Sequence, residues 1–314
     1  MRAIQVTAFG DPDVMRVAEL ADPIPGPREI LVWIRAAGVN PVDTYIRAGQ
    51  YASLPPLPYT PGMDGAGEVK AVGPGVTGIK PGERVYVTGG ATYGEYSLCP
   101  EARVYALPDR VSFEAGAALG VPYDTAYRAL FLVARVEAPD RVLVHGGSGG
   151  VGLAALALLR RVGIRAAATA GSSRGRELVT AERGVPYAHD DAAGLMAFTE
   201  GSGFDVILEM AAHQSLGLDL TLLAPKGRAL VIGSRGAVSI NPRDLMARGA
   251  SVTGIMNNHT SPQELAVIHE DLGRGLADGS IAPVVGRSFP LDEAPAAHRA
   301  VMERGAHGKI VLIP

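Results

Sequence analysis

His145-Gly-Gly-Ser-Gly-Gly-Val-Gly152 says more about the architecture of this chain than any other segment. The apolar run Arg141–His145 has the length of a buried strand, and the Ala-rich run Val151–Val162 after it has the length of a helix. A buried strand, a glycine turn and a helix in this order predict the opening of an α/β domain.

The glycines of this turn have the G-x-G-x-x-G spacing of dinucleotide-binding folds, at Gly147, Gly149 and Gly152. Small residues let the backbone approach a pyrophosphate, and the helix N-terminus supplies free N–H groups and a positive dipole. A purely structural glycine turn is the alternative, but the strand before and the helix after favour the dinucleotide. The residues expected to bind the pyrophosphate are Gly147, Ser148, Gly149, Gly150 and Val151.

The next strand indicates which dinucleotide is bound. NAD-specific folds place an acid about 20 residues beyond the loop for the ribose 2′-hydroxyl, whereas NADP sites use a nearby arginine. Here the strand Arg165–Ala170 is followed by Gly171-Ser-Ser-Arg-Gly-Arg176, which contains no acid. Gly171, Arg174 and Arg176 are therefore expected to bind cofactor, and NADPH is favoured over NADH. The alternative is that both arginines are solvated residues in the first turn of a helix.

The second half of the chain alternates apolar strands with helices. Further strands are expected at Phe204–Met210, Ala229–Gly233 and Ser251–Ile255, with helices near Gly175–Arg183 and Ser215–Leu223. Such alternation indicates a parallel sheet covered on both faces. The fold class is α/β, with a doubly wound (Rossmann) domain.

The first 120 or so residues differ, because short β-like runs are separated by Gly and Pro turns. These runs are Ala3–Val6, Ile30–Ala37, Gly67–Val72, Arg84–Val87 and Tyr93–Leu98. Two helical stretches, Gln263–Leu276 and Asp292–Glu303, and a last strand, Lys309–Ile313, are too few for a third domain. We expect a β-rich domain over residues 1–122 and 263–314, and a nucleotide-binding domain over 123–262.

Composition excludes several classes of protein. A net charge of -3 gives no field to attract nucleic acid, so nucleic acid is not expected as a partner. Cys99 is the only cysteine, which rules out an intrachain disulfide and a four-cysteine zinc site. The chain begins without an apolar signal core and has no apolar run of the ~20 residues that a membrane span needs. A cytoplasmic location is expected.

Several segments together resemble the zeta-crystallin-like quinone oxidoreductases, the zinc-independent branch of the medium-chain dehydrogenases. They are Gly38–Arg47, Pro58–Gly62, Val121–Leu130, Val142–Gly147, Val231–Gly236, Ile240–Arg243 and Gly308–Ile310. The resemblance covers nearly the whole chain. It implies a GroES-like catalytic domain, an inserted nucleotide-binding domain, a cleft between them, and a homodimer or homotetramer.

The resemblance also bears on metal chemistry. Zinc-dependent relatives have a Cys and a His ligand at the positions that match Asn40 and Met63 here. An amide and a thioether cannot hold a catalytic zinc, so no metal ligand is expected. Reduction of an electrophilic acceptor such as a quinone or enone does not need one.

By resemblance, Asn40 and Tyr45 should hydrogen-bond the substrate oxygen or the nicotinamide side, and Tyr51 should line the substrate pocket. Asp43 is expected to orient its neighbours. All four are placed on one Pro-interrupted loop. Packing with a solvated hydroxyl is the alternative for the two tyrosines.

Further cofactor contacts are expected outside the glycine loop. Thr125 begins a helical stretch, Asp124–Leu132, and could instead cap it. Ser234 and the Met256–Asn257 pair follow sheet strands, where α/β folds bind ligands. Near the end of the chain Arg304 and Lys309 could reach a cofactor phosphate or lie on the surface.

Three other residues are interpreted as structural. His145 is expected to be packed and hydrogen-bonded, and Cys99 to be a small core residue. Glu209 ends a buried strand, where its charge needs a partner that the sequence does not identify.

The function expected from these features is NADPH-dependent reduction of a quinone or other α,β-unsaturated carbonyl. A sister branch that reduces 2-enoyl thioesters is the nearest alternative. AU-rich RNA binding or a structural crystallin role is an alternative of another class, and the absence of a basic, aromatic-interleaved stripe argues against RNA.

Overall fold

The computed structural model describes residues 1–305 and 307–314. The chain divides into two compact units, one formed by Met1–Val121 with His269–Pro314 and the other by Pro122–Ile268. The edges expected from the sequence differ by one residue (122 against 121) and by six (263 against 269).

The second unit is built on six parallel strands. In chain order they are β8 (Val142–Val144), β9 (Ala166–Thr169), β10 (Val185–Tyr187), β11 (Phe204–Glu209), β12 (Leu223–Val231) and β13 (Ser251–Gly254). Their order in the sheet is β10-β9-β8-β11-β12-β13, which is the 3-2-1-4-5-6 order of dinucleotide-binding folds. The expected doubly wound sheet is therefore confirmed, and its order reverses between β8 and β11.

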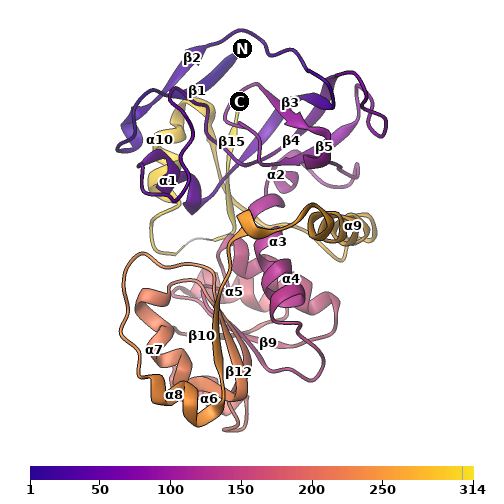
Figure 1. Ribbon diagram of the computed structural model, residues 1–314. Coiled ribbons are helices and arrows are strands. Elements are labelled where there is room, and N and C mark those ends of the chain that lie inside the picture. Colours follow the sequence, from indigo (N-terminus) through magenta and orange to yellow (C-terminus); the bar gives the residue numbers. More distant parts are fainter. Residues whose placement is uncertain (306) are drawn as a thin grey trace. The chain divides into compact units, whose positions relative to one another are not determined.

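Helices cover both faces of this sheet. They are α3 (Gly120–Tyr127, continued by a π-helical turn over Arg128–Val133), α4 (Gly150–Arg161), α5 (Ser173–Ala181), α6 (Ala192–Phe198), α7 (Ala212–Leu222) and α8 (Pro242–Arg248). Figure 1 shows α7 and α8 on one side of the strands and α4 on the other. Leu143 and Ile207 of the sheet pack with Leu216 and Leu220 of α7 in one buried cluster.

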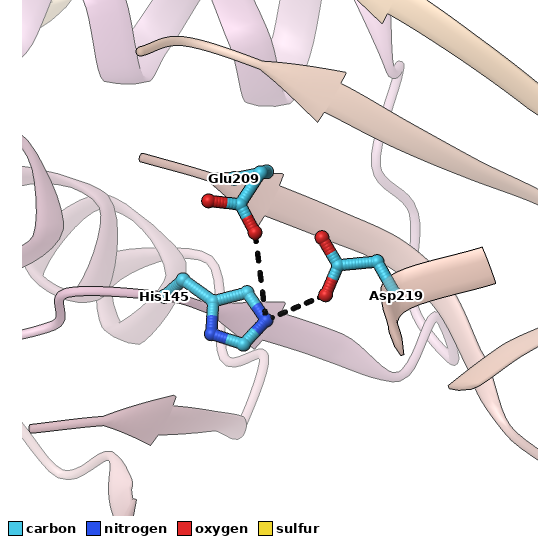
Figure 2. Close-up of side chains that lie close together, drawn as sticks. All are labelled: His145, Glu209 and Asp219. Atoms are coloured by element: carbon cyan, nitrogen blue, oxygen red, sulfur yellow. Dashed lines mark hydrogen bonds and ion pairs between the residues drawn. The ribbon is translucent and has the colours of Figure 1, made fainter. Parts of the chain in front are cut away.

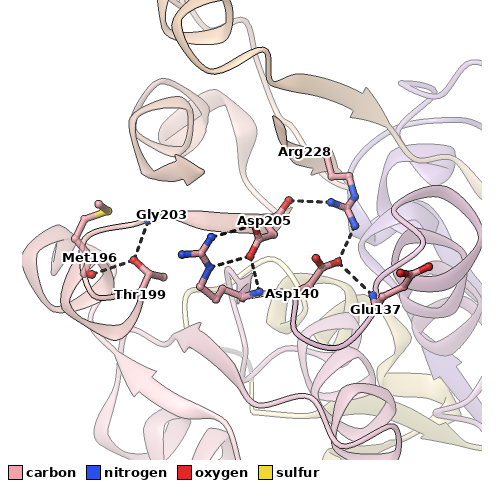
Figure 3. Close-up of polar contacts among 8 residues, drawn as sticks. Glu137, Asp140, Met196, Thr199, Gly203, Asp205 and Arg228 are labelled. Carbon is pink, nitrogen blue, oxygen red and sulfur yellow. Dashed lines mark hydrogen bonds and ion pairs between the residues drawn. The ribbon is translucent and has the colours of Figure 1, made fainter. Parts of the chain in front are cut away.

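Ion pairs hold the edge of the sheet where β8 and β11 begin (Figure 3). Arg141 donates to both carboxylate oxygens of Asp205, at 2.8 and 3.1 Å, and Arg228 donates to Asp140 at 2.7 Å. Buried Thr199, in the turn before β11, donates to the Met196 carbonyl and accepts the Gly203 N–H, both at 3.0 Å. These contacts fix the starts of β8 and β11, and the other end of β8 carries the glycine loop.

The first unit is built on a mostly antiparallel sheet. Its strands are β3 (Glu29–Val39), β4 (Asp64–Val72), β5 (Arg84–Thr88), β6 (Tyr96–Pro100), β7 (Val104–Ala106), β14 (Val285–Pro290) and β15 (Lys309–Ile313). A separate pair, β1 (Arg2–Val6) and β2 (Met15–Glu19), runs antiparallel. The last strand, β15, pairs with β3, with Val311 opposite Gly38, so the end of the chain is part of the first unit.

The helices α1 (Pro41–Arg47), α2 (Phe113–Gly116) and α10 (Ala294–Ala300) belong to this unit, and α9 (Pro262–Asp278) contains the boundary between the second unit and the first. Cys99 lies in the core with no exposed surface, as expected. Among the described residues no helix is long and apolar enough to span a bilayer.

Several expected elements have different bounds in the structure. The strand expected at Ala229–Gly233 is part of β12, which begins at Leu223 and ends at Val231. The strand expected at Tyr93–Leu98 begins at Tyr96, because Tyr93 and Gly94 instead bridge to β1. The helix expected at Asp292–Glu303 covers only Ala294–Ala300, since Pro295 in its first turn fixes the start.

Candidate functional site

The glycine loop follows β8 and leads into α4, whose N-cap is Gly149. A Cβ at Gly147 would lie 2.7 Å from the Ala168 Cβ, and one at Gly152 would lie 2.3 Å from the Gly146 carbonyl oxygen, so packing excludes side chains at both positions. At Gly149 a Cβ would meet only an ordinary contact, 3.4 Å from the same oxygen. Packing within the protein therefore does not require the middle glycine, and the space beside it is open to a ligand.

Some backbone N–H groups of the loop are bonded within the protein, and others are available to a ligand. Gly146 and Gly147 donate to the side-chain and backbone oxygens of Thr169, at 3.2 and 2.8 Å. The first amides of α4, from Gly150 and Val151 on, have no acceptor within the helix. These amides and the helix dipole can hold an anion, and the buried Ser148 lies beside them.

Arg174 and Arg176 lie in the first turn of α5, which follows Gly171 and has Ser172 as its N-cap. Arg174 is exposed and pairs with Glu177 at 3.0 Å, and the Arg176 guanidinium lies 3.4 Å from the Ala170 carbonyl oxygen. This position agrees with both interpretations of the two arginines, as phosphate-binding residues and as solvated residues of a first helical turn. A positive first turn is unfavourable for an isolated helix, however, and becomes favourable when an anion binds.

Two expected cofactor residues contact each other. The Asn257 side-chain amide donates to the Thr125 hydroxyl at 2.9 Å. Neighbouring Met256 is 40% exposed, and Ser234 beyond β12 donates to the Gly236 carbonyl at 2.9 Å. The structure thus joins Thr125 to the end of β13, while contacts of these residues with a cofactor stay predictions.

In the first unit, Asn40 belongs to a buried polar group with Asp64 and Lys309. Its amide nitrogen donates to Asp64 at 2.8 Å, and its amide oxygen accepts from the Lys309 ammonium at 2.5 Å. Lys309 also donates to Asp64 at 2.7 Å. Each of the three is at most 4% exposed. The surface alternative for Lys309 is therefore wrong, and Asn40 has a structural role whether or not it also touches substrate.

The expectation that Asn40, Asp43, Tyr45 and Tyr51 share one loop is wrong for the first part of that segment. Residues Pro41–Arg47 form α1, with Asn40 as N-cap and Pro41 in the first turn. Asp43 accepts the Asn40 backbone N–H at 2.9 Å and completes a capping box. Proline and a capping box both favour a helix start, so the local sequence does contain a signal for α1.

Asp43 is the buried anchor of this helix. The Tyr93 hydroxyl donates to it at 3.2 Å and lies 3.1 Å from His298. Burial, reinforced by nearby Asp64, raises the pKa of Asp43 to about 7. Asp43 is not accessible as a base to a bulky substrate, in keeping with the orienting role expected of it.

The remaining predicted residues are more accessible. Tyr45 on α1 and Tyr51 beyond it are half-buried, and Arg304 is exposed near the end of the first unit. Tyrosines of this exposure can present a ring and a hydroxyl to a ligand. Their contact with substrate, and that of Arg304 with a cofactor, stay predictions.

His145 is packed and hydrogen-bonded, as expected, and it identifies the partner of Glu209. Figure 2 shows its imidazole between two carboxyl groups. His145 Nε2 lies 2.8 Å from Asp219 Oδ1 and 3.9 Å from Glu209 Oε2, while Glu209 also accepts the Ala211 N–H. Asp219 lies on α7, far along the sequence, and no local signal pointed to it.

These three side chains could also be considered as metal ligands, since their ligand atoms lie within 4.8 Å of one another. Two ligands about 2.1 Å from a tetrahedral zinc would be about 3.4 Å apart. The 2.8 Å separation of the His145 and Asp219 atoms is instead that of a direct hydrogen bond. The cluster is therefore interpreted as a hydrogen-bonded network.

Comparison with known proteins identifies the family. Residues 26–109 match the alcohol dehydrogenase GroES-like domain, and residues 181–312 match a family described as zinc-binding dehydrogenase. The human quinone oxidoreductase is 41% identical, with 100% of this chain and 98% of the human protein covered. The chain belongs to the zeta-crystallin-like quinone oxidoreductases. The GroES-like and Rossmann parts expected for this quinone oxidoreductase family are both confirmed.

Solved structures agree with this membership. A mycobacterial protein complexed with NADPH is 31% identical, with a TM-score of 0.92 and complete coverage of both chains. The quinone oxidoreductase of Escherichia coli complexed with NADPH is 28% identical, with a TM-score of 0.90 and complete coverage of both chains.

Because one matched family is described as zinc-binding, we asked whether this quinone oxidoreductase family member could hold zinc where zinc-dependent relatives do. The matching positions are Asn40 and Met63, an amide and a thioether. The Asn40 oxygen and the adjacent Asp64 carboxylate already bind the Lys309 ammonium, which would repel a second cation. The residues at these positions do not fit a catalytic zinc.

Proposed function

We propose that this protein reduces quinones, or other α,β-unsaturated carbonyl compounds, with electrons from NADPH and without zinc. The observation that carries the proposal is the glycine loop at the strand-order reversal between β8 and β11. Its open side at Gly149 and the unpaired amides of α4 fit a pyrophosphate. The human relative is named a quinone oxidoreductase, and the mycobacterial and Escherichia coli structures hold NADPH.

Preference for NADPH over NADH is supported by the start of α5. The segment Gly171–Arg176 contains no carboxylate to bind a ribose 2′-hydroxyl, and it presents Arg174 and Arg176 at a helix N-terminus. A 2′-phosphate there gains charge-assisted hydrogen bonds and interacts favourably with the helix dipole.

Bound NADPH supplies the hydride or electrons, and the residues of the chain hold the reactants. Tyr45 and Tyr51 would contact the acceptor, with a hydroxyl available to polarise its carbonyl oxygen. Asn40 and Asp43 would set the position of Tyr45 through the capped start of α1. Zinc is not required, because a quinone is already electrophilic and can take its protons from solvent.

A 2-enoyl thioester or simple enone is the substrate class closest to quinones, and the same residues could serve it. We further propose a cytoplasmic enzyme that assembles as a homodimer or homotetramer. Light scattering after size-exclusion chromatography tests the assembly.

One experiment tests the function. Protein dialysed against EDTA and checked for zinc by elemental analysis is titrated with NADPH and NADH by cofactor fluorescence. 1,4-Benzoquinone, 9,10-phenanthrenequinone and a 2-enoyl thioester are then added. We expect NADPH to bind at least tenfold more tightly than NADH, and quinone to oxidise it rapidly without zinc. Restoration of activity only by added zinc would contradict the zinc-free mechanism, and turnover of the thioester alone would reassign the substrate.

A further inference from the structure

A chain of buried side chains runs from the core of the second unit to the glycine loop. Thr169 Oγ1 lies 3.1 Å from His145 Nδ1, and His145 Nε2 lies 2.8 Å from Asp219 Oδ1. Glu209 is the far end of the chain, as Figure 2 shows. We propose that these four side chains, from Glu209 to Thr169, are positioning residues that fix the glycine loop for the dinucleotide. The proposal rests on the binding of NADPH proposed above.

The first link concerns which of two buried carboxyl groups carries the charge. Glu209 and Asp219 are both 0% exposed. Two adjacent carboxylates removed from water cannot both stay ionised. Burial, reinforced by nearby Asp219, raises the pKa of Glu209 to about 8. At neutral pH Glu209 therefore keeps its proton, and Asp219 is the anion of the pair.

The second link sets the tautomer of His145. Burial lowers the pKa of this histidine, so its imidazole is neutral and has one N–H. The Asp219 carboxylate can only accept, so the proton must be on Nε2. The other ring nitrogen, Nδ1, is then an acceptor.

The third link sets the direction of the Thr169 hydroxyl. Because Nδ1 has no proton, the hydroxyl donates to it, and the lone pairs of the oxygen accept the Gly146 N–H at 3.2 Å. The Thr169 carbonyl accepts the next amide, that of Gly147, at 2.8 Å. One residue at the end of β9 thus binds both amides that begin the loop.

This arrangement determines which loop amides face the ligand. With Gly146 and Gly147 held inward, the following turn brings the N-terminus of α4 to the open side of Gly149. A network that fails at any link leaves a buried donor or acceptor without a partner, and the loop loses its anchor. Loss of the network should therefore weaken cofactor binding and leave the rate of the chemical step unchanged.

Three substitutions test the chain. Thr169→Val removes the hydroxyl, Thr169→Ser keeps it, and Asp219→Asn replaces an acceptor by an amide that can donate to Nε2. We expect the dissociation constant for NADPH to rise about tenfold in Thr169→Val and Asp219→Asn, which corresponds to the ~1.4 kcal/mol of one buried hydrogen bond. Thr169→Ser should restore most of the affinity. In Thr169→Val and Asp219→Asn the KM for NADPH should rise together with the dissociation constant, while kcat at saturating NADPH and the KM for quinone change little.

Thr199→Val is the matched control. Thr199 is also a buried threonine of the second unit with a hydroxyl bonded to two backbone groups (Figure 3), but it precedes β11 at the opposite edge of the sheet. Its loss should lower the melting temperature without changing NADPH affinity. Equal dissociation constants for Thr169→Val and Thr199→Val would overturn the proposal.

A readout on the free protein separates this proposal from the proposed function. Long-range ¹H–¹⁵N spectra should show His145 protonated at Nε2 in the wild type and at Nδ1 in Asp219→Asn. Exchange of the Gly146 and Gly147 amides should be at least tenfold faster in Thr169→Val than in Thr199→Val. A wild-type protein that fails to bind NADPH would refute the function, whereas an Nδ1-protonated wild-type histidine or unchanged amide exchange would refute the positioning network.

Discussion

At the scale of single residues, Lys309 is a charged residue whose burial gives it a structural role. A Cβ at Gly38 would lie 2.7 Å from the Lys309 Cε, so glycine at this position admits the lysine side chain to the interior. There its ammonium binds Asn40 and Asp64, and the other Asp64 oxygen accepts the Val121 N–H at 2.9 Å. The lysine is therefore part of the framework that holds the start of α1.

Lys309→Met should destabilise the protein strongly, because it leaves the Asp64 carboxylate buried without its cation. Removal of one partner of a buried pair costs about 3–5 kcal/mol of unfolding free energy. The double variant Lys309→Met/Asp64→Asn should lose less than Lys309→Met alone. Urea unfolding measures both variants.

Arg274→Met is the comparison for Lys309→Met. Arg274 pairs with Glu270 and Asp271 but is 59% exposed, so its loss should have little effect. If Lys309→Met were no more destabilising than Arg274→Met, the assigned role of Lys309 would be wrong.

At the scale of elements, the first turn of α5 gives the sharpest prediction about cofactor choice. Replacing both arginines (Arg174→Ala/Arg176→Ala) should weaken NADPH binding about 10- to 100-fold. NADH binding should be nearly unchanged, because NADH has no 2′-phosphate for these arginines to bind. Fluorescence titration with each cofactor checks this.

Arg160→Ala and Arg161→Ala provide controls, because these arginines lie in the last turn of α4, away from the glycine loop. A parallel loss of affinity for both cofactors in the α5 variant would mean that the arginines stabilise the helix and do not select NADPH.

Two of the missed elements, β10 and β14, have weak local signals. Pro186 in β10 breaks the usual strand pattern and is tolerated because β10 is an edge strand. In β14 the residues Gly286–Ser288 are exposed, and the parallel pairing with β15 defines the strand. Central strands such as β8 and β11 were predicted because they are buried on both faces and continuously apolar.

At the scale of the whole molecule, stability should depend on pH through Glu209. Its pKa is about 8 in the folded protein, against 4.5 as its ordinary value. Between these values the folded state holds a proton that the unfolded state lacks, so stability falls as pH rises, by up to about 1.4 kcal/mol per pH unit.

Glu209→Gln should remove this contribution, since the amide cannot ionise. The difference in unfolding free energy between pH 5.5 and 7.5 should be smaller in the variant than in the wild type, as measured by urea titration at both pH values. A difference of equal size in the two proteins would show that Glu209 does not hold the proton assigned to it.

The sequence by itself determined the class of fold and the place of the nucleotide loop. The spacing of Gly147, Gly149 and Gly152 between an apolar strand and an apolar helix is a local pattern, and local patterns can be read without knowing the rest of the molecule. The absence of an acid after β9 and the residues Asn40 and Met63 were equally visible. Together they indicated an NADPH-type site and argued against zinc.

Only the tertiary structure decided how the buried charges are satisfied. Lys309 reaches Asp64 because β15 returns to β3, and Asp219 reaches His145 because α7 packs over the sheet. These partners are 245 and 74 residues apart in sequence, so no spacing rule could pair them. A buried charge must find a counterpart, and the sequence shows that the need exists, but the fold alone brings the counterpart within hydrogen-bonding distance.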